Sequence, residues 1–167
     1  MDEVANPRRH ITFNGPLEAG VRVVAVLGAA YPQAFDLHRL TALDYLLVRT
    51  SDLSGGPDSL HPPTPIRSPD AEVRRRIVQQ GLMLMMSRDL VERQATAIGI
   101  QYNAGENAAA FLDSLRTPYL VQLKLRADWL INHFKDQPDE VFNRTIQSFF
   151  DNWVVEFQEF EQSLGSP

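Results

Sequence analysis

Cysteine is absent from the 167 residues of this chain. Its absence excludes disulfides, thiolate zinc sites, iron–sulfur clusters and a cysteine nucleophile. Long uninterrupted apolar runs are also lacking, so nothing in the sequence predicts a membrane-spanning helix. The first ten residues, MDEVANPRRH, carry acids and a proline where a secretory signal has a basic and then an apolar run. We therefore expect a cytoplasmic protein without membrane contact.

Positive charge is scarce, because 16 Lys and Arg stand against 21 Asp and Glu and give a net charge of −5. A domain that holds nucleic acid mainly by neutralising phosphates usually has the opposite sign. The densest basic cluster, Arg74 to Arg76, lies in a predicted helix, where consecutive side chains point in different directions. A solvated helix face explains this cluster best.

Catalytic and cofactor motifs are missing as well. The four histidines, at positions 10, 38, 61 and 133, stand in different predicted elements and form no HExxH motif. The glycines form neither a phosphate-binding loop nor a GxGxxG fingerprint, and no serine stands in a GxSxG turn. We therefore expect a protein that is not an enzyme and that uses no metal or other cofactor.

The most informative segment runs from Ser87 to Leu115. It begins an extended run at Leu90, reverses direction over residues 95–99, and returns through Asn103 before a helix that starts near Glu106. This pattern predicts a β-hairpin that follows directly on a helix, which is how a winged helix ends.

Three helices are predicted ahead of this hairpin. The first begins at Asn14, a candidate N-cap, and ends before Pro32; the second is capped by Asp36 and runs to about Leu53; the third begins at Ser68. The apolar positions expected to bring the third helix onto the core are Val73, Ile77, Leu82, Met85 and Met86. Together with the hairpin, these elements predict a mainly α protein with a winged-helix-like core.

A loop rich in Gly, Pro and Ser, residues 51–68, separates the second and third helices. Its composition is incompatible with a continued helix or a central strand, and its length is typical of binding loops. The segment is either a long ordered loop or a binding loop, and we hypothesise that it contacts a partner protein through Leu60, His61, Pro62 and Ile66. A catalytic role for His61 lacks a nucleophile and an orienting acid nearby in the sequence.

A C-terminal helical extension is predicted beyond the hairpin. One helix is capped by Thr117 and runs to about Phe134, and another runs from Pro138 to about Gln162. The last helix carries an apolar stripe at helical spacing, made of Phe142, Ile146, Phe149, Trp153, Phe157 and Phe160. We expect most of the stripe to pack on the preceding helix, on Tyr119, Leu123, Leu125, Trp129 and Leu130. The exposed side of Phe149, Trp153 and Phe157 is predicted to contact a partner.

Three segments together carry a family resemblance. They are ITFNGPLEAGVRVVAVLGAAYPQAFDLHRLTALDYLLV, the loop SLHPPTPIRS, and GLMLMMSRDLVERQATAIGIQYNAGENAAAFLDSL with the PYLVQLKLRADWL that follows. From about Ile11 to Phe134 the chain resembles the small middle component of bacterial ABC-three component systems, which include Lamassu-type antiphage defence. The joint occurrence of the FNGPLEAG start, the AFDLHRL helix and the LHPP loop makes the resemblance specific.

The resemblance implies a non-catalytic adaptor that docks on an SMC- or Rad50-like ABC ATPase and couples sensing of foreign DNA to an effector nuclease. DNA contact would then come mainly through the complex. The expected organisation is a winged-helix-like domain at residues 1–115 and the helical extension at residues 116–167, packed as one unit.

A second interpretation is a stand-alone winged-helix DNA-binding transcriptional regulator. In such a protein the third helix enters the major groove, and the residues available for that role are Arg74, Arg75 and Gln79, with Arg93 on the wing. The sequence leaves both interpretations open.

Overall fold

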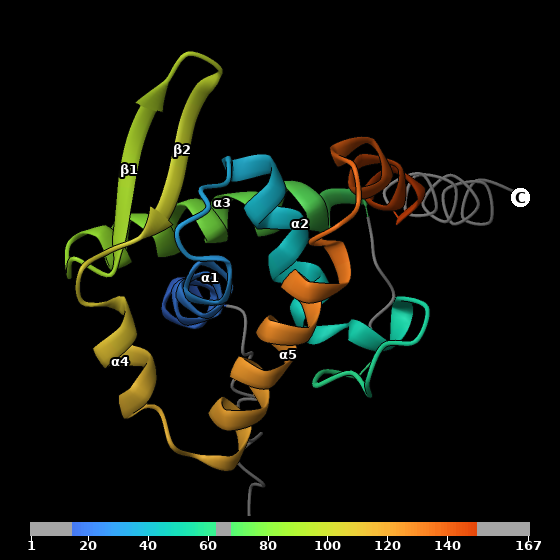
Figure 1. The fold of residues 1–167 in the computed structure, drawn as a ribbon, viewed down its shortest axis with the longest axis horizontal. Coiled ribbons are helices and arrows are strands. Elements are labelled where there is room, and N and C mark those ends of the chain that lie inside the picture. The colour runs from blue at the N-terminus through green and yellow to red at the C-terminus, as the bar shows by residue number, and fades with distance from the viewer. Residues whose placement is uncertain (1–14, 63–67, 150–167) are drawn as a thin grey trace, which may run out of the picture.

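The computed structural model describes residues 15–62 and 68–149 and is mainly helical, with one small antiparallel hairpin and a helix near the C-terminus (Figure 1). The elements are α1 (Pro16–Ala30), α2 (Leu37–Val48), a 3-10 turn (Thr50–Asp52), α3 (Ser68–Met86), β1 (Val91–Thr96), β2 (Gly99–Ala104), α4 (Ala108–Ser114) and α5 (Pro118–Phe134). A further helix covers residues 139–149. The predicted fold class, mainly α with a small hairpin and a C-terminal helical extension, is confirmed.

Two of the three predicted N-caps agree with the structure. Asp36 caps α2 by accepting a hydrogen bond of 2.7 Å from the Arg39 amide, and Thr117 caps α5 in the same way. Pro32 follows the end of α1, as predicted. The predicted N-cap of α1 is wrong, because the N-cap position is Gly15, which has no side chain to offer. Four residues named in the sequence analysis, Ile66, Trp153, Phe157 and Phe160, lie outside the described residues.

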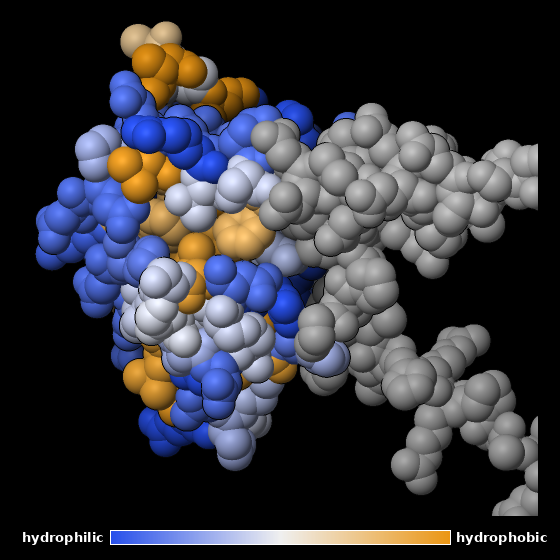
Figure 2. All heavy atoms as spheres, turned by 90° about the vertical axis from the view of Figure 1, so that its right-hand side faces the viewer, coloured by the Kyte–Doolittle hydropathy of each residue, from blue (hydrophilic) through white to orange (hydrophobic). Residues whose placement is uncertain are grey.

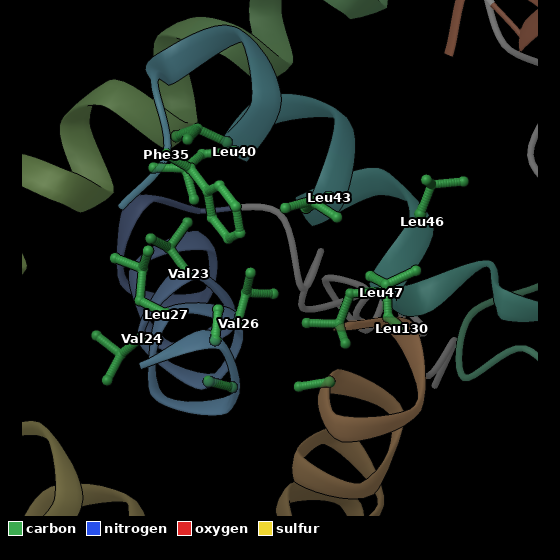
Figure 3. Packing of buried hydrophobic residues seen from close by; sticks show 14 of the residues in the cluster. Val23, Val24, Val26, Leu27, Phe35, Leu40, Leu43, Leu46, Leu47 and Leu130 are labelled. Carbon is green, nitrogen blue, oxygen red and sulfur yellow. The ribbon is translucent and has the colours of Figure 1, made fainter. Parts of the chain in front are cut away.

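Helix α1 lies at the centre of the core and packs against α2, α3, α4, α5 and β2. Figure 3 shows side chains of α1, α2 and α5 converging, with Leu47 of α2 beside Leu130 of α5. Both leucines are fully buried, as are Val23, Val24 and Leu27 of α1. Burial of this many branched side chains supplies most of the free energy that holds the helices together.

The crossing of α1 and α3 depends on two glycines. A Cβ atom added to Gly81 would lie 2.7 Å from the Gly20 nitrogen and 2.8 Å from the Pro16 oxygen. The two backbones therefore approach more closely than any side chain allows. The core face of α3 is formed by Val78, Leu82 and Met85, and Val73 is exposed.

The predicted core contacts Leu82 and Met85 of α3 are thus confirmed as buried, and Met86 is partly buried against the core, while Val73 is wrong. At 100° per residue Val73 stands about 140° around the helix from Val78, so it points away from α1. The sequence did not predict Val78 as a core residue, because apolar residues lie on more than one face of this helix and their spacing does not single out one buried face.

The hairpin projects from the helical body beside α3 (Figure 1). Its strands pair in register from Val91 opposite Ala104 to Thr96 opposite Gly99, with the reversal at residues 97–98. Phe35, between α1 and α2, exchanges two backbone hydrogen bonds of 2.8 and 2.9 Å with Tyr102. Phe35, which is far from the hairpin in sequence, thus forms a single β-bridge to β2. This bridge attaches the hairpin to the helical body.

The C-terminal helix packs on the body through the start of its apolar stripe. Phe142 is 1% exposed, lies edge-on to Phe134 with ring centroids 4.9 Å apart, and is covered by the Arg39 guanidinium at 4.0 Å. Ile146 is also buried. The expected packing of the stripe within the chain is confirmed for these residues, but Leu125, one of the predicted contacts, is exposed because it lies on the outer side of α5.

Candidate partner interface

The described part of the 51–68 loop, residues 51–62, is held by hydrogen bonds to the end of α2 and to α5. The His61 amide donates to the Val48 oxygen at 3.1 Å, and Arg49 donates back to the His61 oxygen at 3.1 Å. The His61 ring stacks on Tyr119, with 2.8 Å between Nε2 and the phenol oxygen. Arg126 donates to the Asp58 oxygen, also at 3.1 Å. Residues 51–62 of the loop are therefore held in place, and they connect the end of α2 to α5.

The predicted contact residues of this loop differ in how far their side chains are exposed to a partner. Leu60 is partly buried against the core, so it anchors the loop. His61 is half-buried, and Pro62 is exposed. Of these three residues, Pro62 is the most open to a partner.

A buried charge cluster lies next to the loop and joins three helices. Asp44 of α2 accepts from Arg22 of α1, with Nε and Oδ1 2.6 Å apart, and from Arg74 of α3, with Nη1 and Oδ2 2.7 Å apart. The side chains of Arg22 and Asp44 are 3% and 1% exposed. Buried charges of this kind are tolerated only when they are paired and hydrogen-bonded, so the cluster fixes how α1, α2 and α3 meet.

The cluster influences the ionisation of the ring pair beside it. Burial, followed by the positive charges of Arg22 and Arg74, lowers the pKa of His61 below its ordinary value. Burial raises the pKa of Tyr119. Both groups are therefore held in their neutral forms near pH 7, in which a neutral hydrogen bond joins them.

A second tyrosine lies at the other side of the cluster. Burial and the nearby Asp52 carboxylate raise the pKa of Tyr45 to about 12. Its hydroxyl donates to Asp52 at 3.2 Å, and the Arg74 guanidinium lies 5.3 Å from its ring centroid. The Phe149 ring, one of the predicted partner contacts, lies 6.1 Å from the Tyr45 ring and is partly buried. Part of the Phe149 ring surface is therefore buried in a contact within the chain.

The predicted DNA-binding residues are not equally available. Arg74 is paired with Asp44, so the prediction that it is exposed for a major groove is wrong. Arg75 and Gln79, one turn apart on α3, are exposed, and so is Arg93 on β1. The helix face left to DNA therefore carries one arginine fewer than the sequence predicted.

Sequence reasoning missed the apolar turn of the hairpin. Ile98 is 85% exposed, and Ile100 beside it is exposed as well. Figure 2 shows hydrophobic atoms at the top of the molecule, the height at which Figure 1 shows the hairpin. An isoleucine at a turn, where polar residues are usual, was the available signal.

No group of three or more His, Asp or Glu able to hold a metal ion occurs in the described ranges. Across the same part of the chain, no helix is both long and apolar enough to cross a membrane. Asp44, which is buried, and His61, which is half-buried, are used in contacts within the chain.

A family model described as ABC-three component (ABC-3C) system Middle Component 2 matches residues 12–156. The match covers the helical body and the hairpin, and it confirms the resemblance to a middle component that the sequence carries. Comparisons with curated proteins and with solved structures find no match.

Proposed function

Because this chain belongs to the Middle Component 2 family of ABC-three component systems, we propose that it is a non-catalytic adaptor which docks on an SMC- or Rad50-like ABC ATPase. Systems of this kind are antiphage assemblies of several components, so the chain works together with other subunits. In the proposal the adaptor couples sensing of foreign DNA by the ATPase to an effector nuclease, in a cytoplasmic complex of the Lamassu type.

The family match over residues 12–156 is the observation that carries the proposal. The use of the ionisable groups agrees with it, because Asp44 holds two arginines and His61 is bonded to Tyr119. Groups used in this way position helices and a loop and are not directed toward a substrate. Pro62 and, outside the described residues, Trp153 and Phe157 are the proposed docking positions.

Expression of the tagged protein from its own operon tests the adaptor role. Mass spectrometry of the material that co-purifies at moderate salt should identify a large coiled-coil ATPase and an effector subunit. Recovery of the protein alone, as a dimer that retains DNA, would contradict the proposal and favour a transcriptional regulator.

The regulator interpretation makes a separate prediction that a salt titration can test. A protein that reads DNA through α3 loses affinity steeply as salt rises, and it loses more when Arg75 or Arg93 becomes alanine. An adaptor without its own DNA site binds duplex DNA weakly and is unaffected by both substitutions. Because Arg74 is paired with Asp44 within the chain, the DNA-facing side of α3 has one arginine fewer, and we expect the second result.

A further inference from the structure

A groove of about 830 Å³ lies between the C-terminal half of α1, the end of β2, α4 and α5. Its lining is more apolar than polar. The floor consists of small residues from three elements: Ala25, Gly28 and Ala29 of α1, Ala104 of β2, and Ala108 and Ala109 of α4. Leu112 of α4 also lines the groove and covers Gly28, because a Cβ atom added to Gly28 would lie 2.5 Å from Leu112 Cδ1. The alanine positions of the floor let an apolar side chain of another molecule approach closely.

The rim of the groove is strongly acidic. Four exposed carboxylates surround the floor, those of Glu92, Glu106, Asp113 and Asp128. Lys124 is the single basic residue in the lining, and its ammonium donates to the Leu112 oxygen in the last turn of α4 at 2.8 Å. Lys124 is therefore used in part to cap α4, and the rim keeps a net negative charge.

An aromatic side chain stands at one edge. Tyr31 follows the end of α1, is 68% exposed and lines the groove. Exposed tyrosines at the border of an apolar surface are common anchors in protein interfaces, because they bury a large ring at little cost in conformational entropy. The ring face also attracts the cationic head of lysine or arginine.

We propose that this groove is the docking site for a basic amphipathic segment of another subunit of the same complex, with small apolar side chains on the floor and Lys or Arg against the acidic rim. The proposal rests on the proposed function, because that function supplies the second subunit. Charge complementarity selects this occupant, since four carboxylates against one lysine repel the phosphates of a nucleic acid.

The two parts of the groove contribute differently. The rim carboxylates are exposed, so they mainly raise the association rate and select the partner. The floor and Tyr31 exclude water, so they contribute most of the affinity and slow dissociation. Reversal of rim charge and filling of the floor are therefore two independent ways to disturb the site.

The test uses the tagged chain co-expressed with the other subunits of its operon. The rim variant carries Glu106→Lys and Asp128→Lys, and the floor variant carries Ala109→Trp, all at exposed positions where the fold should survive. The matched control carries Glu72→Lys and Asp136→Lys, which make the same change in net charge at exposed positions outside the groove lining. Thermal unfolding of each purified variant checks the fold.

The expected result is that the rim and floor variants each recover about tenfold less of a co-expressed subunit than the wild type. The control should recover as much as the wild type, and the rim variant's loss should be greatest at low salt. A photoreactive residue at position 109 should cross-link to a subunit segment that contains Lys or Arg.

Other results would overturn the inference. Equal recovery by all variants, or an equal loss with the control, would remove the groove proposal and leave the adaptor function standing. A cross-link to DNA, to a second copy of this chain or to a segment without basic residues would do the same. If the wild-type protein recovers no subunit at all, the proposed function fails, and the groove proposal fails with it.

Discussion

Arg74 of α3 and Asp44 of α2 are joined by a hydrogen-bonded ion pair of 2.7 Å, and Asp44 is at the same time bonded to the buried Arg22. The side chain that the sequence predicts for a DNA groove is therefore used to hold one helix on another. The pair also explains why an acidic residue lies in the middle of an otherwise apolar helix face.

Substitution of Asp44 should destabilise the protein much more than substitution of Arg74. Asp44→Ala removes the carboxylate from a guanidinium that is 3% exposed, and we expect a loss of about 3–5 kcal/mol in the free energy of unfolding. Arg74→Ala leaves the Arg22 to Asp44 pair intact and should cost about 1–2 kcal/mol, since Arg74 is partly solvated. Urea unfolding measures both values.

The exposed Asp136 provides a matched control for the first prediction. Asp136→Ala should change stability by no more than about 0.5 kcal/mol. An Asp44→Ala protein as stable as Asp136→Ala would show that the buried cluster does not hold the helices.

Stability should decrease as the pH falls below about 6.5, in part because of His61. The pKa of His61 is lowered in the folded protein, so the unfolded chain takes up a proton first, and the equilibrium moves toward unfolding. Above the unfolded value both states are neutral, and the contribution is constant. Chemical unfolding at a series of pH values from neutral to mildly acidic measures the slope.

His61→Asn should make this slope shallower than in the wild type. Tyr119→Phe should cost about 0.5–1.5 kcal/mol at neutral pH through the lost hydrogen bond. A slope that is unchanged in His61→Asn would mean that other groups cause the acid sensitivity.

Phe142→Ala should destabilise the protein by about 3–5 kcal/mol, because the ring is fully buried between Phe134 and Arg39. Leu125→Ala, at an exposed apolar position of α5, serves as the comparison and should stay within about 0.5 kcal/mol. Thermal or urea unfolding distinguishes the two. Similar small effects for both would place the last helix outside the cooperative core.

Gly81→Ala tests the crossing of α1 and α3. Alanine normally stabilises a helix interior by about 1 kcal/mol relative to glycine. Here the added methyl meets the Gly20 backbone at 2.7 Å, so the helices must move apart, and we expect a net loss of about 1–3 kcal/mol. Gln80→Ala, one residue away and exposed, should be close to neutral. A stabilised Gly81→Ala protein would contradict the close crossing.

Most of the fold was predictable because its signals are local. Asp36 and Thr117 cap helices through side chains that reach amides three residues on, and Pro32 stops α1 by its own geometry. The hairpin from Val91 to Ala104 shows its strands and turn within fourteen consecutive residues of sequence. The errors at Asn14 and Val73 concern a boundary and a rotation about a helix axis, which neighbouring residues specify poorly.

The sequence by itself determined the type and order of the elements, the acidic charge balance and the family of the chain. Only the tertiary structure decided which side chains are available to partners. It paired Arg74 with Asp44, bridged Phe35 to Tyr102, and brought Ala25, Ala104 and Asp128 to one groove. These contacts join residues far apart in the chain, and whether they form depends on how the helices pack against one another, which no local pattern records.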